Sequence, residues 1–144
     1  MADHSNLKFS IDIGKKRVKL YKCSHEEYEN ILKHNIIQPF SKHLLCQTFY
    51  ENEITLYVYI DEDNKFDHFI LSKLCITDER EYHIVTIYED VPGIDHVGII
   101  HHISSYFLKE SIPILYINTY GNNLILICDE MMEKASKILD FMKL

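Results

Sequence analysis

The second half of the chain decides the fold, and its residues 82–128 read YHIVTIYEDVPGIDHVGIIHHISSYFLKESIPILYINTYGNNLILIC. Tyr82–Tyr88 is rich in β-branched residues and predicts a strand with a buried interior. Glu89–Gly93 contains Pro and Gly and predicts a loop. In Ile94–Lys109 apolar residues recur at three- and four-residue steps, so we expect a helix with one apolar face.

Two strands and a helix follow in the same half. Ile112–Thr119 and Leu124–Cys128 have the apolar composition of strands, and residues 120–123 between them predict a turn. We expect Asp129 to cap a last helix, because an Asp side chain accepts hydrogen bonds from the free N–H groups of a helix start. The apolar stripe of this helix is expected to comprise Met131, Ala135, Ile138, Leu139 and Met142.

The first half of the chain opens with a strand pattern and a helix signal. Phe9–Leu20 alternates apolar and polar residues on both sides of Gly14-Lys15, which predicts a hairpin that turns at these two residues. Ser24 and Glu27 have the spacing of a capping box, in which each side chain accepts a hydrogen bond from the other residue's backbone N–H. They predict a helix start, and Pro39 is expected to close the helix.

The rest of the first half repeats the order of the second. Leu44–Tyr50 and Ile54–Ile60 predict two strands around a polar turn, and Asp61–Lys65 predicts a charged surface loop. Phe66–Leu74 fits either a short helix or a strand. The order strand, helix, strand, strand, helix therefore occurs in both halves and indicates an internal duplication. Strands that alternate in polarity are typical of a sheet with one face in solvent.

Composition and charge exclude several classes of protein. The 144 residues carry 15 Lys+Arg against 22 Asp+Glu, a net charge of −7, which argues against a nucleic-acid surface. No apolar run approaches the roughly 18 residues of a membrane span, so we expect no contact with a membrane. The four cysteines form no CxxC pair. We therefore expect reduced, buried thiols and a cytosolic location.

The signals for catalysis and metal binding are weak. His101 and His102 point about 100° apart on a helix, and His96 lies five residues before His101, so the three lack the spacing of a metal site. The charged loop that starts at Asp61 lacks the Gly and Glu that an EF-hand requires. No phosphate-binding glycine loop or nucleophile elbow occurs. We therefore expect no enzyme activity, no cofactor and no bound metal.

The segment Asp90-Val91-Pro92-Gly93-Ile94, between the predicted strand and helix, is the strongest candidate for a ligand site. Its glycine lets a ligand approach the backbone closely, and the free N–H groups at a helix start attract a carboxylate. Asp90 could accept the amine of the same ligand. The segment thus has the groups to recognise both ends of a free α-amino acid, and the alternative is a tight turn that binds nothing.

Around this segment the residues resemble a known family. The strand, the loop with Gly93, the helix and the strand at Ile112–Ile117 together resemble the ACT domain, a βαββαβ regulatory module that binds amino acids. More narrowly, two stretches look like the ACT units of the cytosolic arginine sensors of the TOR pathway. These stretches are Pro113–Tyr120 followed by Asn123–Ile127, and Cys46–Leu56 followed by Asp61-Glu62.

The resemblance implies a fold class and a division of the chain. The class is α+β, with tandem ferredoxin-like (ACT-like βαββαβ) units whose antiparallel sheets carry helices on one face. The two units are expected at about residues 1–74 and 75–144.

The function that the resemblance implies is a non-catalytic amino-acid-binding regulatory or sensor protein, with its ligand at a domain or subunit interface. Asp90 would hold the amine, and the backbone of Gly93 and Ile94 the carboxylate. The other contacts would come from Val91, Ile112, Pro113 and Ile114. The alternative is a structural or protein-interaction module with an ACT fold that binds no small molecule. Pro113 favours this alternative because it lacks a backbone N–H.

The resemblance also suggests an assembly. A two-unit chain would recover the arrangement of a four-unit sensor by homodimerisation, because an ACT-like sheet leaves an edge strand and an apolar helix face uncovered. The predicted helix carries Tyr106, Phe107 and Leu108 in succession, which is more apolar surface than one buried stripe requires. We therefore expect a homodimer with the Asp90 loops at its interface, and a regulatory protein as a further partner.

Overall fold

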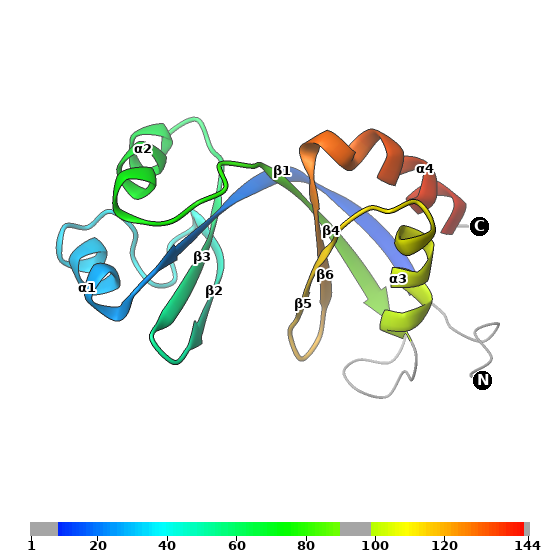
Figure 1. Ribbon diagram of the computed structural model, residues 1–144, viewed down its shortest axis with the longest axis horizontal. Helices are drawn as coiled ribbons and strands as arrows, with labels where there is room; N and C mark the ends of the chain where they lie inside the picture. The colour runs from blue at the N-terminus through cyan, green and yellow to red at the C-terminus, as the bar shows by residue number, and fades with distance from the viewer. Residues whose placement is uncertain (1–8, 90–98, 143–144) are drawn as a thin grey trace. The chain divides into compact units, whose positions relative to one another are not determined.

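The computed structural model describes residues 9–89 and 99–142, in which the order strand, helix, strand, strand, helix occurs twice, as predicted (Figure 1). Contacts within the chain divide it into two compact units. The N-terminal unit is Lys16–Glu81, and the C-terminal unit combines Met1–Lys15 with Tyr82–Leu144. Strand β1 (Phe9–Cys23) therefore contributes residues to both units. The repeat boundary between residues 74 and 75 stays a prediction, because compact units are defined by contacts and not by repetition.

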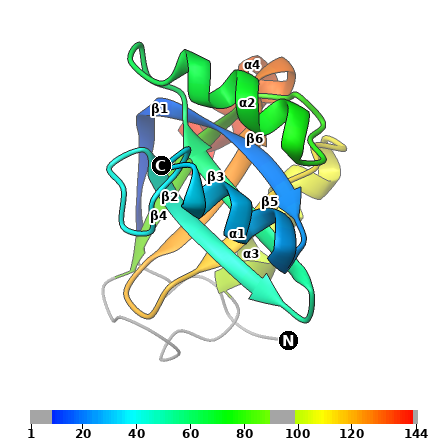
Figure 2. The ribbon, with the colours of Figure 1, turned by 90° about the vertical axis from the view of Figure 1, so that its left-hand side faces the viewer.

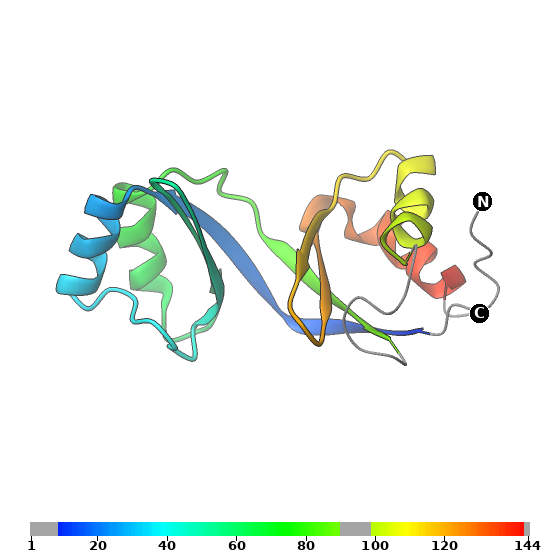
Figure 3. The ribbon, with the colours of Figure 1, turned by 90° about the horizontal axis from the view of Figure 1, so that it is seen from below.

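In the N-terminal unit, antiparallel strands lie in the order β2-β3-β1. On the other side of β1, Ile76 forms a single β-bridge with Lys22 and takes the place of a fourth strand. This is the strand order of a ferredoxin-like unit. Both helices cover one face of the sheet (Figures 2 and 3). Besides β1, the elements of this unit are α1 (His25–Lys33), β2 (Leu44–Tyr50), β3 (Glu53–Tyr59) and α2 (Lys65–Leu74).

The C-terminal unit has the same arrangement, with strands in the order β1-β4-β6-β5. Strand β6 is antiparallel to both of its neighbours. The outer strand beside β4 is β1, which enters this unit through Phe9–Lys15. Helices α3 and α4 lie on the same side of the strands (Figure 3). Besides β1, the elements are β4 (Tyr82–Glu89), α3 (Ile99–Lys109), β5 (Leu115–Asn118), β6 (Asn123–Cys128), a 3-10 turn (Asp129–Met131) and α4 (Met132–Met142).

Each unit has its own apolar core between sheet and helices, which confirms the predicted α+β class. In β3 every second residue is buried, and these residues pack with Ile31 of α1 and Leu71 of α2. The undecided segment Phe66–Leu74 is thus helical, with Leu71 as its buried apolar residue. The core of the C-terminal unit comprises Val85, Ile87, Ile103, Phe107, Ile112, Ile125, Ile127, Ala135 and Leu139.

The predicted hairpin at Gly14-Lys15 is wrong. Strand β1 continues without a turn from Phe9 to Cys23, and its residues from Val18 onward pair with β3. A hairpin needs its two arms to pair with each other, whereas the two halves of β1 belong to different units and have other neighbours. The alternation of apolar and polar residues has the same period in both arrangements, so it did not distinguish them.

Two predictions at the end of the chain need correction. The strand expected at Ile112–Thr119 is only Leu115–Asn118, since Pro113 has no N–H to give to a strand ladder. Asp129 does not stand before the last helix as its cap but opens the 3-10 turn that precedes α4. Its carboxylate accepts a hydrogen bond from Nε2 of His83 at 2.6 Å. The first residues of the predicted helix Ile94–Lys109 lie outside the described residues, and α3 begins at Ile99.

The predicted capping box is confirmed at the start of α1. Ser24 Oγ accepts from the Glu27 N–H at 3.2 Å, and the Glu27 carboxylate accepts from the Ser24 N–H at 2.9 Å. The helix ends in a Schellman motif, in which the Ile36 N–H donates to the Ile31 carbonyl at 3.1 Å and Asn35 has a φ of 55°. Both helix ends are therefore satisfied by local hydrogen bonds.

Substitutions at the two apolar residues Leu139 and Phe141 on α4 test which face of the helix packs against the core. Leu139 is fully buried and Phe141 is 61% exposed. We expect Leu139→Ala to lower the free energy of unfolding by about 2–5 kcal/mol, and Phe141→Ala by less than about 1 kcal/mol. Urea unfolding followed by circular dichroism measures both values. Equal losses in the two variants would contradict the described core.

Candidate functional site

The structure describes only part of the predicted ligand site. Four of its residues lie outside the described residues 9–89 and 99–142, namely Asp90, Val91, Gly93 and Ile94. Of the other three, Ile112 is buried in the core of the C-terminal unit, Ile114 packs against that core, and Pro113 is exposed. The described half of the predicted site thus contributes to the core more than to an open surface.

The backbone of Ile112 belongs to the end of α3. Its N–H donates to the Phe107 carbonyl at 3.0 Å, and the Ser111 N–H donates to the Leu108 carbonyl at 3.0 Å. Ser111 has a φ of 56°, so α3 ends in the same Schellman motif as α1. The Ile112 N–H therefore already has a partner within the chain, and Pro113 has no N–H at all.

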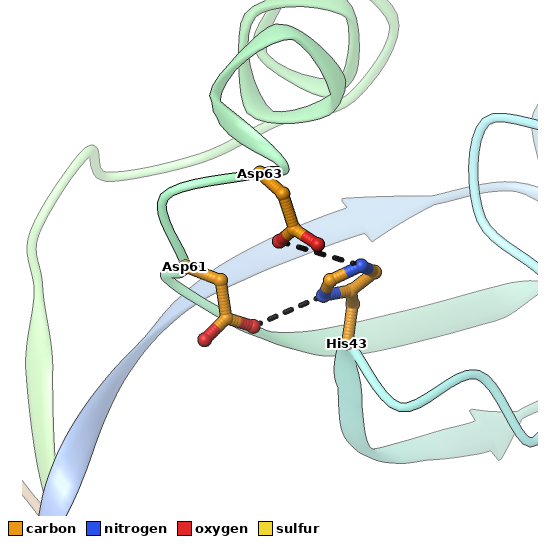
Figure 4. A group of neighbouring side chains, drawn as sticks. All are labelled: His43, Asp61 and Asp63. Atoms are coloured by element: carbon orange, nitrogen blue, oxygen red, sulfur yellow. Dashed lines mark hydrogen bonds and ion pairs between the residues drawn. The ribbon is translucent and has the colours of Figure 1, made fainter.

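A second candidate site, formed by His43, Asp61 and Asp63, was not indicated by the sequence (Figure 4). His43 stands just before β2, and the two Asp residues lie between β3 and α2. Nδ1 of His43 is 3.0 Å from Oδ2 of Asp61, and its Nε2 is 3.7 Å from Oδ1 of Asp63. One ligand atom from each residue lies within 4.8 Å of the others, which is close enough for a shared metal ion.

The charges around this cluster favour an ion-pair network over a metal centre. Nζ of Lys16 lies 3.1 Å from Asp61, and Nζ of Lys42 lies 3.5 Å from Asp63. The hydrogen bond from His43, together with Lys16, holds the pKa of Asp61 below its usual range against the opposing effect of burial. A divalent cation would have to compete with two ammonium groups for the same carboxylates. We therefore interpret the cluster as a structural network of the N-terminal unit.

A third group of polar side chains is buried in the N-terminal unit. Oη of Tyr21 lies 2.6 Å from Nδ1 of His68, and Nε2 of His68 lies 2.9 Å from the carbonyl oxygen of Tyr59. Because a carbonyl only accepts, Nε2 carries the proton, and the Tyr21 hydroxyl donates to Nδ1. Asn64, which is 1% exposed, donates to the same carbonyl at 2.7 Å. This network connects β1, β3 and α2.

Burial keeps Tyr21, His68 and two of the thiols in their uncharged forms. Burial raises the pKa of Tyr21 and lowers the pKa of His68, so both side chains are uncharged near neutral pH. Burial also raises the pKa of the Cys46 thiol to about 11 and that of the Cys75 thiol to about 12. A thiol with a raised pKa is a poor nucleophile at neutral pH. These groups therefore give no support to a catalytic role.

The four cysteines are free thiols in the structure. Cys23 is buried, as predicted for all of them, whereas Cys46, Cys75 and Cys128 are partly exposed. Within the described residues no helix is both long and apolar enough to cross a membrane.

Comparison with known proteins identifies the family that the C-terminal unit resembles. A family model described as "ACT domain" matches residues 79–140. Comparison with curated protein sequences gave no match. Among solved structures, a protein of unknown function from Vibrio cholerae, described as a "Possible Transport Protein", is similar with a TM-score of 0.63 and 11% identity. The match covers 94% of this chain and 91% of that chain.

Two aspartokinases are also similar in structure. Clostridium acetobutylicum aspartate kinase has a TM-score of 0.61 and 14% identity, over 94% of this chain and 34% of that chain. Escherichia coli aspartokinase III in complex with lysine and aspartate has a TM-score of 0.50 and 17% identity, over 96% of this chain and 33% of that chain. The chain thus spans about a third of either enzyme. At these identities the likeness concerns the fold.

The matches define the class of protein. The chain is an α+β protein of tandem ACT-like units, as the sequence predicted, and it carries an ACT-domain match in its second half. The narrower resemblance to the arginine sensors of the TOR pathway is not supported, because the matching model is that of the general ACT domain and the similar structures belong to other proteins.

The buried His68 predicts that stability depends on pH. Its pKa is lowered by burial, so below about pH 6.5, the usual His value, the unfolded chain binds a proton that the folded chain refuses. We expect the unfolding free energy to fall as the pH drops below 6.5 towards the folded pKa, by up to about 1.4 kcal/mol per pH unit from this residue.

The measurement is urea unfolding between pH 7.5 and 5, compared with two variants. His68→Gln keeps a donor for the Tyr59 carbonyl. It should remove the contribution of this one titrating group from the slope of the unfolding free energy against pH. His34→Gln changes an exposed histidine and should leave the slope as in the wild type. A His68→Gln slope equal to that of the wild type would refute the assignment.

Proposed function

We propose that this chain is a non-catalytic regulatory or sensor protein that binds a free amino acid. The observation that carries the proposal is the ACT-domain match at residues 79–140, which includes the segment Asp90–Ile94 between β4 and α3. The tandem ACT-like fold agrees with it, and one similar structure, aspartokinase III, was solved in complex with lysine and aspartate.

The chemistry of the proposed site suits a zwitterion. Asp90 would accept the α-amine, and the backbone N–H groups at Gly93 and Ile94 would donate to the α-carboxylate. The Ile112 N–H is held by Phe107. Binding of the ligand's carboxylate would therefore depend on the backbone N–H groups of the loop. Further contacts would come from Val91, Ile112, Pro113 and Ile114.

The alternative is a protein-interaction module with the same fold and no small ligand. The observation that favours it is the end of α3, where the Ile112 N–H already has a partner and Pro113 has none to offer. A site that has lost its ligand would show this pattern. A regulatory subunit that acts on a separate partner chain is compatible with either function.

We also propose that two copies associate, with the Asp90 loops at the subunit interface. Strand β5 forms one edge of the C-terminal sheet, and an uncovered edge strand tends to pair with another chain. On the helical side, Phe107 is buried in the core, but Leu108 is 78% exposed. This apolar side chain, together with the edge strand, is surface that a symmetric partner would cover.

A thermal-shift screen of the twenty amino acids tests the ligand. A ligand at 100 times its Kd stabilises the folded chain by about 2.7 kcal/mol, so we expect one amino acid or a small group of them to raise the Tm by several degrees. If no amino acid moves the transition, the sensor function is wrong and the interaction module is favoured.

A matched pair of variants locates the binding. Asp90→Ala should abolish the shift, because it removes the partner of the ligand's amine, and should leave the Tm without ligand nearly unchanged. Asp140→Ala removes an exposed carboxylate on α4 and should retain the shift. A full ligand response in Asp90→Ala would exclude the proposed site.

Sedimentation equilibrium at micromolar concentration tests the assembly. We expect a mass about twice the 17.1 kDa of one chain. Leu108→Lys places a charge on the exposed apolar side chain and should shift the protein towards the monomer, whereas Lys137→Glu, also on a helix surface, should change the mass less. A wild-type mass that stays at 17.1 kDa would contradict both the dimer and a ligand site shared between subunits.

A further inference from the structure

Two cysteines face each other at the edge of the N-terminal sheet. Cys23 is the last residue of β1, and Cys75 directly follows α2 with extended backbone angles, φ −121° and ψ 166°. Their neighbours Lys22 and Ile76 form an antiparallel bridge. In that bridge the Lys22 N–H donates to the Ile76 carbonyl at 2.8 Å, and the Ile76 N–H donates to the Lys22 carbonyl at 2.9 Å.

This register brings the two thiols together. In an antiparallel pair, one step forward on one strand lies opposite one step back on the other, so Cys23 lies opposite Cys75. Because Lys22 and Ile76 exchange both hydrogen bonds, the Cys pair is of the non-hydrogen-bonded kind, whose Cα atoms are about 4.5 Å apart. A disulfide needs roughly 4.4–6.8 Å between Cα atoms. Opposite residues also point to the same face of a sheet.

The side chains agree with the backbone register. Both cysteines belong to the apolar core of the N-terminal unit, Cys23 as a buried member and Cys75 packed against it. The pKa of each thiol is also affected by the other thiol, which agrees with side chains that lie close together. The backbone register and the shared core thus place the two thiols beside each other.

In the described strand register, the other two cysteines lie opposite tyrosines and not opposite a thiol. Cys46 on β2 lies opposite Tyr57, and Cys128 on β6 lies opposite Tyr82. Cys46 is also partly exposed and also has a pKa raised by burial. It is therefore a matched control for a claim about Cys23 and Cys75, since it differs from Cys75 in lacking an opposite thiol.

We propose that Cys23 and Cys75 form a redox pair that closes into a cross-strand disulfide when the protein meets a peroxide. Cys75, the more exposed of the two, attacks one peroxide oxygen as its thiolate, the O–O bond breaks, and a sulfenic acid forms while hydroxide leaves and is protonated to water. The Cys23 sulfur then displaces the hydroxyl from the Cys75 sulfur as a second water. Two thiols lose two hydrogens, and hydrogen peroxide becomes two waters.

Burial sets the conditions under which the pair reacts. It raises the pKa of Cys75 to about 12 and also raises that of Cys23. Since the thiolate is the attacking species, the reaction is slow at neutral pH and accelerates as the pH rises. The pair therefore responds to sustained oxidation and not to brief exposure. A disulfide would fix Cys75, the residue before Ile76, against β1. At present Ile76 itself is held there by two backbone hydrogen bonds with Lys22.

Peptide mapping of the oxidised full-length chain tests the proposal. The protein is treated with hydrogen peroxide at pH 8.5, quenched with catalase, alkylated in denaturant and digested with trypsin without reduction. Cys23 then lies in peptide 23–33 and Cys75 in peptide 74–80. We expect these two peptides joined, about 2 Da lighter than their sum, separated again by dithiothreitol, with Cys46 and Cys128 alkylated.

Cysteine variants and isotope labelling show which two thiols pair and whether they belong to one chain. Cys75→Ser should abolish the joined peptide and Cys46→Ser should retain it, with circular dichroism to show that each variant is folded. A mixture of ¹⁵N-labelled and unlabelled protein should give no mixed-label peptide pair, because the bond is within one chain. The oxidised wild type should melt several degrees higher than the reduced form.

Three outcomes would overturn the proposal: Cys23 and Cys75 still alkylated after oxidation of the other two cysteines, a disulfide between other cysteines, or a mixed-label pair. If Cys75→Ser does not fold, the wild-type peptide map alone decides. The inference goes beyond amino-acid binding and does not depend on it, since the residues of the ligand loop take no part in it.

Discussion

Each of the two ferredoxin-like sheets needs a strand beside its first strand, and the chain meets this need in two unequal ways. The C-terminal unit takes Phe9–Lys15 from the start of the chain as a strand beside β4. The N-terminal unit has only Ile76, held to Lys22 by two hydrogen bonds. Strand β1 must therefore be long and unbroken, because Val18–Cys23 are needed in one sheet and the residues before them in the other. An edge held at one residue opens more readily than a strand held by a ladder of hydrogen bonds.

Local sequence patterns predicted local structure well, but they did not predict contacts between residues far apart in the sequence. The capping box at Ser24 and Glu27 was visible because its donors and acceptors are three residues apart and depend on nothing else. The hairpin at Gly14 was wrong because alternation records which residues face a core and not which strand lies alongside. His43 was missed because its partner Asp61 is eighteen residues away in sequence, and no fixed spacing relates an ion pair between a strand start and a loop.

The sequence predicted the chemistry of the loop in the candidate ligand site, but it did not predict what happens at Ile112. An Asp beside a glycine and a helix start is a pattern that the sequence shows directly, and the ACT-domain match includes it. The contribution of Ile112 was not predictable, because it depends on how α3 ends. Ser111 adopts the left-handed conformation that glycine favours, and this lets the Ile112 N–H turn back to the Phe107 carbonyl. The backbone donor that a ligand would need is thus used to end a helix.

Helix α2 connects the remaining observations. Its buried residues are His68 and Leu71, while Phe66 and Phe69 are exposed, so little apolar burial holds it to the sheet. Polar contacts through His68, and the packing of Cys75 against the core after the helix ends, supply the rest. Protonation acts on the first contact and oxidation on the second, and both lie in the N-terminal unit, whereas the ACT-domain match lies mainly in the C-terminal unit. The response of this protein to solution conditions and its proposed response to an amino acid therefore depend on different residues, and single substitutions separate them.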